Sequence, residues 1–143
     1  MKQLFFSLVA LVALVAWTPD TQSKEGRKFM VMLTGDQEAP NPGDPDGMGK
    51  ALITINIGRG TLSYQLMVSG IEPATAAHIH EAPRGEAGPV VVGLEAPTSG
   101  SSSGTITSLS REELKEIMKN PEDYYINVHN ADFPGGALRG QLR

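Results

Sequence analysis

The chain of 143 residues contains no cysteine, one tryptophan and only three histidines. Without cysteine it can form no disulfide, offers no thiolate to a metal and has no cysteine nucleophile. A lipid anchor attached through cysteine is excluded for the same reason. Stability must therefore come from packing, from hydrogen bonds and from any ion that the protein binds.

Positive charge is also scarce. The chain has 12 basic and 16 acidic residues, a formal net charge of −4, and no cluster of lysine or arginine. Such a surface argues against nucleic acid or an anionic membrane as a partner. No glycine-rich phosphate loop precedes a helix, and the acidic residues lack the spacing of an EF-hand. The oligomeric state and any protein partner are left open.

One long apolar run is present, and it lies at the N-terminus. Residues 4–17 carry no charge and follow a lysine at position 2. The run is shorter than the about 20 residues that span a bilayer, and small residues follow it. This pattern predicts a secretory signal peptide over residues 1–16, cleaved after Ala16, and a secreted or periplasmic protein. An uncleaved anchor is the alternative.

After a polar linker over residues 17–27, the sequence predicts one domain over residues 28–143. Short strand-like segments there are separated by glycine and proline. The expected strands are residues 28–34, 51–57, 61–69, 75–80, 89–94, 105–107, 124–129 and 137–142. The intervals 35–50 and 97–104 are expected as loops.

One helix is expected after Ser110, which with Glu113 has the pattern of a capping box. An apolar stripe follows, and Asn120-Pro121 ends it. Because strands greatly outnumber helices, the pattern predicts an all-β fold. We expect an antiparallel β-sandwich or flattened barrel, of Ig-like or Greek-key type, with one short helix in a crossover. An open α+β sheet with the helix on one face is the alternative.

The three histidines fall in two short segments, AHIH with His78 and His80, and NVHN with His129. Residues two apart in a strand point to the same face, so His78 and His80 project together. The isoleucine between them would then face the core. If the two segments are neighbouring strands, the three imidazoles can converge on one ion.

Three imidazoles leave a coordination position open to water or another ligand. The pattern predicts a metal site of His78, His80 and His129. Copper is favoured and zinc is the alternative, since copper(II) binds nitrogen ligands more tightly. Structural hydrogen bonding by the histidines, in an interaction module without metal, is the competing interpretation.

Three further residues are weighed as contributors. Met67 is a candidate extra ligand, although apolar cover of the sheet is the better interpretation. Glu81 and Asp132 could accept the second N–H of a ligand imidazole, or could be solvated loop acids. A zinc hydrolase would need a base such as Glu81. No residue is assigned a catalytic role, and enzymatic activity is left open.

Several motifs in order resemble the CHRD domain, the module named after chordin. They are GDQEAP at residues 35–40, AAHIH at 76–80, GPVVV at 88–92, YINVH at 125–129, PGG at 134–136 and LRGQL at 138–142. The resemblance runs from about Lys28 to the C-terminus, and Ala137 departs from it where many relatives have glutamate. It implies an extracytoplasmic all-β domain with a histidine-bound metal, copper above all, on His78, His80 and His129. The growth-factor binding of chordin is not implied, because it cannot be matched to residues of this chain.

Overall fold

A computed structural model describes residues 26–143 of the chain. The predicted signal peptide over residues 1–16, and all but the last two residues of the predicted linker, lie outside the described residues. Within them, all strand pairs are antiparallel and the strands form one sheet in the order β5-β4-β7-β8-β1-β2-β3-β6. The strands are β1 (Arg27–Thr34), β2 (Met48–Asn56), β3 (Thr61–Ser69), β4 (Ala74–Glu81), β5 (Val90–Leu94), β6 (Ser101–Ile106), β7 (Tyr124–Asn130) and β8 (Leu138–Gln141).

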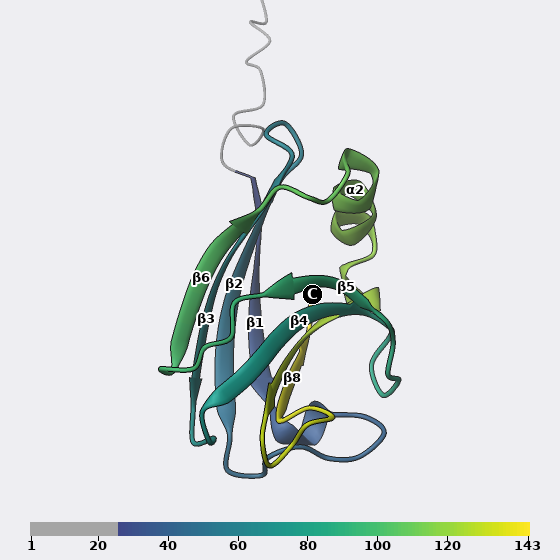
Figure 1. The fold of residues 1–143 in the computed structure, drawn as a ribbon. Coiled ribbons are helices and arrows are strands. Elements are labelled where there is room, and N and C mark those ends of the chain that lie inside the picture. The colour runs from purple at the N-terminus through teal and green to yellow at the C-terminus, as the bar shows by residue number, and fades with distance from the viewer. Residues whose placement is uncertain (1–25) are drawn as a thin grey trace, which may run out of the picture.

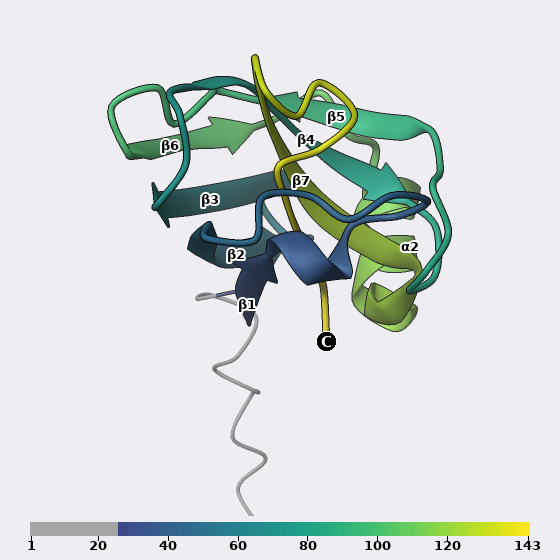
Figure 2. The ribbon, with the colours of Figure 1, turned by 90° about the horizontal axis from the view of Figure 1, so that it is seen from below.

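The sheet bends round on itself into a nearly closed barrel or sandwich (Figures 1 and 2), which confirms the all-β prediction. Alternation along each strand sends one set of side chains inward. The inner set of the best-filled strands comprises Phe29, Val31, Leu33, Ala51, Ile53, Ile55, Leu62, Tyr64, Leu66, Ile79, Ile126, Val128 and Leu138. This inner set is apolar apart from the hydroxyl of Tyr64, and the histidines of β4 and β7 stand on the opposite, outer face.

The helix α2 (Arg111–Lys119) covers one end of the barrel (Figure 1). Ser110 accepts a hydrogen bond from the backbone of Glu113, whose carboxylate accepts one from the Ser110 backbone, so the predicted capping box is present. Leu114 and Ile117 on one side of the helix are fully buried. No helix within residues 26–143 has both the length and the apolar character needed to cross a membrane.

Two predicted loops are partly strand. β6 begins at Ser101, although the serine- and glycine-rich interval 97–104 was expected to be a loop. The segment is ordered by its neighbour β3, whose Leu66 and Tyr64 pair with Ser102 and Gly104. Pairing with a neighbouring strand outweighs weak intrinsic β-propensity. Similarly, β2 begins at Met48, within the expected loop 35–50, and residues Gly35–Gln37 form the 3-10 helix η1.

Two strand glycines differ sharply in the room around them. A Cβ on Gly140 of β8 would lie 2.5 Å from the Met32 carbonyl oxygen and 2.6 Å from Val31 Cγ1, both in β1. A Cβ on Gly93 of β5 would meet nothing within 4 Å. Glycine at position 140 therefore allows β8 to pack closely against β1.

We predict that Gly140→Ala lowers the free energy of unfolding by about 1–3 kcal/mol, because the added methyl group overpacks the contact between β8 and β1. The matched control Gly93→Ala adds the same group to open space and should change it by less than about 0.5 kcal/mol. Urea denaturation of both variants measures the difference. Equal effects of the two substitutions would show that the approach of β8 to β1 is not constrained in this way.

Candidate metal centre

The pairing of β4 with β7 brings the three histidines together. His78 lies opposite Asn127, and His129 lies opposite Ala76. Since Ala76, His78 and His80 alternate onto the same face of β4, His129 stands diagonally across from His78. One ligand atom from each imidazole can be chosen so that all three lie within 4.8 Å of one another. The two strands are neighbours, which is the condition that the predicted site required, and the histidines stand on the outer face as expected.

Two of the imidazoles have their tautomers fixed by backbone carbonyls. His80 Nδ1 lies 2.9 Å from the Gly88 carbonyl oxygen, and His129 Nδ1 lies 2.9 Å from that of Pro134. A carbonyl oxygen can only accept, so each Nδ1–H donates and each Nε2 carries a lone pair. This arrangement is the one that second-shell acceptors impose on metal-binding histidines.

The two Nε2 lone pairs have different surroundings. His129 Nε2 lies 3.2 Å from His78 Nδ1, which can donate to it. His80 Nε2 is buried and has no hydrogen-bond partner among the described residues. Buried polar atoms nearly always have a partner, so an unpaired one needs an explanation. A metal ion held between the three rings fits the donor set and would supply the missing partner.

The pKa values of two histidines favour the neutral form that a metal requires. Burial lowers the pKa of His78, and the nearby His129 and His80 lower it further. Burial also lowers the pKa of His80, against a smaller opposing effect of the hydrogen bond to Gly88. Near neutral pH these two imidazoles therefore hold lone pairs rather than an extra proton.

A stack of aromatic and cationic groups supports His80 on the outer face. The Tyr125 ring lies parallel to the His80 ring, with centroids 4.9 Å apart and an interplanar angle of 11°. The guanidinium of Arg139, on β8, lies 3.5 Å from the centroid of the Tyr125 ring. Arg139 is only 1% exposed. Packing on both sides holds Tyr125 in place, and Tyr125 in turn fixes the plane of His80.

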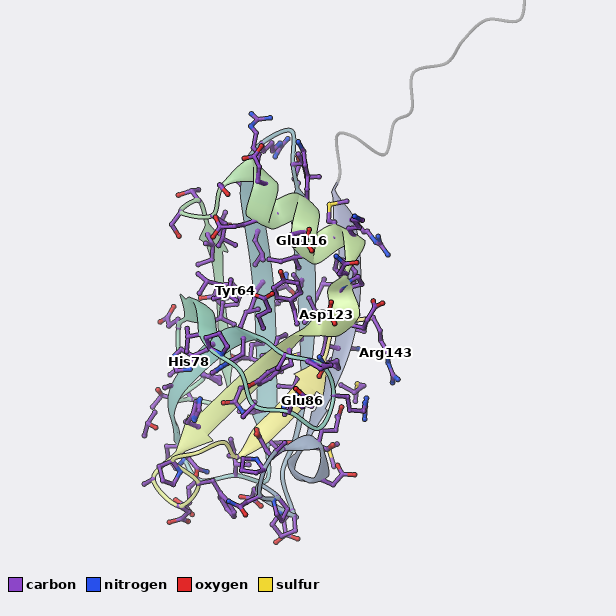
Figure 3. The ribbon with its side chains drawn as sticks, turned by 90° about the vertical axis from the view of Figure 1, so that its right-hand side faces the viewer. Tyr64, His78, Glu86, Glu116, Asp123 and Arg143 are labelled. Atoms are coloured by element: carbon purple, nitrogen blue, oxygen red, sulfur yellow. The ribbon has the colours of Figure 1, made fainter. Side chains whose placement is uncertain are left out.

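Arg139 also anchors the loop that supplies the Gly88 carbonyl. Its guanidinium donates to the backbone carbonyls of Glu86 and Pro83 and to the side chain of Gln141. Figure 3 shows His78 on β4 and Glu86 in the loop that connects β4 to β5. Arg139 thus acts on His80 twice, through Tyr125 and through the loop.

Asn127, which lies between His78 and Arg139 in the sheet, connects the site to the N-terminal part of the domain. Its side-chain amide donates to Glu38 and, at 3.4 Å, to the Leu138 carbonyl. Burial raises the pKa of Glu38 to about 7, while Arg139 and the hydrogen bond from Asn127 act in the opposite direction. Glu38 belongs to the GDQEAP segment, so this motif is tied to the strand that carries His129.

Sequence reasoning named the three histidines but missed Tyr125, Arg139 and Glu38. The position of Tyr125 could have been predicted from the alternation of side chains along the strand, because Tyr125 stands on the same face as Asn127 and His129. Arg139 follows the same rule on β8, where it lies opposite Asn127. Its burial could not be read from the sequence, since it depends on the loop that folds over it.

The additional candidates are placed elsewhere. Met67 lies on β3, and β7, β8, β1 and β2 separate that strand from β4 in the sheet. Glu81 follows His80 and alternates to the opposite face, where its charge acts on Tyr124. The second N–H groups of His80 and His129 are taken by backbone carbonyls, in place of the predicted carboxylates of Glu81 and Asp132.

A family model described as the CHRD domain matches residues 29–142. The chain belongs to the CHRD-domain family. The match spans all eight strands apart from the first two residues of β1, and it confirms the resemblance seen in the motifs. No curated protein and no solved structure matches the chain. Membership supports an extracellular module, and the histidines, Tyr125 and Arg139 all fall within the matched CHRD segment.

The raised pKa of Glu38 predicts a specific pH dependence of stability. The folded protein holds the Glu38 proton up to about pH 7, whereas the unfolded chain releases it near the ordinary value of 4.5. The folded state therefore binds more protons in this window, so the Glu38 contribution makes the free energy of unfolding fall as pH rises.

We predict that Glu38→Gln, which mimics the protonated form, flattens this dependence between those two pH values. Urea denaturation across the pH series measures it, with Glu112→Gln on the exposed face of α2 as the control for loss of one charge. Parallel curves for wild type and Glu38→Gln would contradict the assigned pKa.

Proposed function

We propose that this CHRD domain is exported and binds one metal ion, copper(II) in preference to zinc, through His78, His80 and His129. The observation that carries the proposal is the buried, unpartnered Nε2 of His80, one of the three histidines whose ligand atoms lie close together. Export is supported by the apolar N-terminal run and by the extracellular character of the family.

The donor set determines which ions fit. Three neutral imidazoles suit copper and zinc, and copper(II) exceeds zinc in affinity at nitrogen sites. A chain without cysteine offers no thiolate to shift that order. Because the residues supply three ligands, at least one position is left for water or an exchangeable ligand. Such a site suits storage, buffering or delivery of the ion.

Two loops flank the histidine site on the outer face of the sheet and leave it partly exposed to solvent. His80 is 9% exposed, whereas His78 and His129 are each partly exposed. The Gly88 carbonyl of the 82–89 loop accepts a hydrogen bond from His80. The Pro134 carbonyl of the 131–137 loop accepts one from His129. An ion can therefore enter from solvent without unfolding the sheet.

A second candidate function is a metal-free interaction module. It is favoured by the same hydrogen bonds, because His80 to Gly88, His129 to Pro134 and His78 to His129 tie two loops to the sheet without an ion. In that case each lost hydrogen bond should cost about 1 kcal/mol. A metal-free module does not explain why the buried His80 Nε2 lacks a hydrogen-bond partner.

We predict that the purified chain, prepared without a histidine tag, binds about one copper(II) and that His78→Ala/His80→Ala/His129→Ala abolishes this binding. Elemental analysis after dialysis measures the content. Copper should also raise the thermal unfolding midpoint of the wild type and leave that of the triple variant unchanged, because a ligand stabilises only the state that binds it.

The single variant Glu112→Gln, far along the chain on the helix, is the control and should bind as the wild type does. Equal copper content in the wild type and the triple histidine variant would refute the proposed site. Loss of stability in that variant without any copper-dependent difference would favour the interaction module.

A further inference from the structure

Methionine is concentrated on one exposed surface, the outer face of β1, β2 and β3. Met30, Met32, Met48 and Met67 are 51%, 56%, 58% and 54% exposed. Among the described residues, the other exposed large hydrophobic side chain is Val90, on β5. Methionine is usually found in protein interiors. Four exposed methionines on three neighbouring strands therefore need a chemical reason.

The strand register groups three of them. Met32 on β1 and Met67 on β3 lie on either side of Lys50, each paired with it across a strand boundary. Met48 lies two residues from Lys50 on β2, and therefore on the same face. Met32, Met48 and Met67 together line one open cavity of about 250 Å³. Met30 lies two residues before Met32 on β1 and does not line this cavity.

The three sulfurs are within reach of a common ion. Met32 and Met67 are two strand spacings apart, roughly 9–10 Å between backbones. Methionine has an unbranched side chain with three rotatable bonds, so each sulfur can move several bond lengths toward the centre. Met48 lies on β2, the strand between them, so its sulfur can complete a triangle with the sulfurs of Met32 and Met67. Their high exposure means that no packing holds these side chains away from that arrangement.

We propose that Met32, Met48 and Met67 form a second metal site, which binds a soft monovalent cation, copper(I), through three thioether sulfurs. Thioethers are soft ligands that select copper(I), and in a chain without cysteine they are the sulfur donors available. The site is distinct from the histidine site on β4 and β7, because β8 lies between β7 and β1 in the sheet and the cavity lined by the three methionines includes no histidine. Figure 2 shows β3 and β4 in different parts of the curved sheet.

The composition of this face favours a metal over a docked protein. Protein-binding surfaces are enriched in aromatic residues as well as methionine. The cavity that the three methionines line has no aromatic residue, and its other members are Gly49, Lys50, Val68 and Ser69. The ammonium of Lys50 opposes a bound cation, which a monovalent ion tolerates better than a divalent one. Lys50 is exposed, so its long side chain can turn outward into water.

Silver(I) tests the site without redox chemistry, as a soft monovalent probe. In a protein labelled with ¹³C at the methionine methyl groups, titration with silver(I) should shift the signals of Met32, Met48 and Met67 together. The shifts should saturate at about one equivalent for this site. The signal of Met118, on α2 and outside the cavity, serves as the internal reference and should stay in place.

A triple variant distinguishes binding by the methionine sulfurs from a general effect of the apolar surface. Met32→Leu/Met48→Leu/Met67→Leu keeps the face apolar and the histidines intact, so it should lose one silver(I) equivalent and keep copper(II) binding at the histidines. Met30→Leu is the matched control and should bind both ions as the wild type does. Lys50→Gln should tighten silver(I) binding several-fold, because it removes the opposing charge.

Unchanged silver(I) binding in the triple leucine variant would overturn the proposal. So would shifts that spread equally over all methionine signals, or silver(I) binding that disappears only in the triple histidine variant. Capture of a protein partner by both wild type and leucine variant, without loss of a silver(I) equivalent, would mark the face as an apolar docking surface instead. Because copper(II) and silver(I) are measured separately, failure of this site and failure of the histidine site give different results.

Discussion

The antiparallel register between β4 and β7 is the constraint on which the histidine site depends. Pairing of His78 with Asn127 and of Ala76 with His129 sets all three imidazoles on one face. A slip of one residue would turn the histidines of one strand into the apolar interior. The buried side chains of Ile79, Ile126 and Val128 oppose such a slip, since it would expose them to water. The core therefore fixes the positions of the polar groups outside it.

The outer face of β4, β7 and β8 is unusual because it is polar and yet largely covered. Burial of the Arg139 cation costs free energy, and this cost is offset by three hydrogen bonds and by the Tyr125 ring beneath it. The hydrogen bonds from Arg139 also hold the loop over residues 82–89 in the position where the Gly88 carbonyl orients His80. The same interactions that order the loop thus fix the orientation of the His80 imidazole.

Much of the fold and the central part of the site could be predicted from the sequence, because both follow from alternation within strands. Ile79 was expected in the core, and His78 and His80 outside it, as the structure shows. The serine-rich part of β6 over residues 101–104 could not be predicted, since its order comes from pairing with β3.

Neither could the roles of Arg139 and Glu38, because they depend on contacts with segments about 50 and 90 residues away. Local pattern fixes which face a side chain takes, whereas only the folded chain decides what covers it. The CHRD match strengthens the fold assignment and leaves the ligand to be established from the residues themselves.

The central claim is that three imidazoles on two paired strands surround one ion. Anomalous diffraction at the copper edge, from crystals of the copper(II)-loaded chain, tests it most directly. The account predicts a single strong peak about 2 Å from a nitrogen of each of His78, His80 and His129, with His80 contributing Nε2. A peak elsewhere, or no peak between the three rings at full loading, would contradict it.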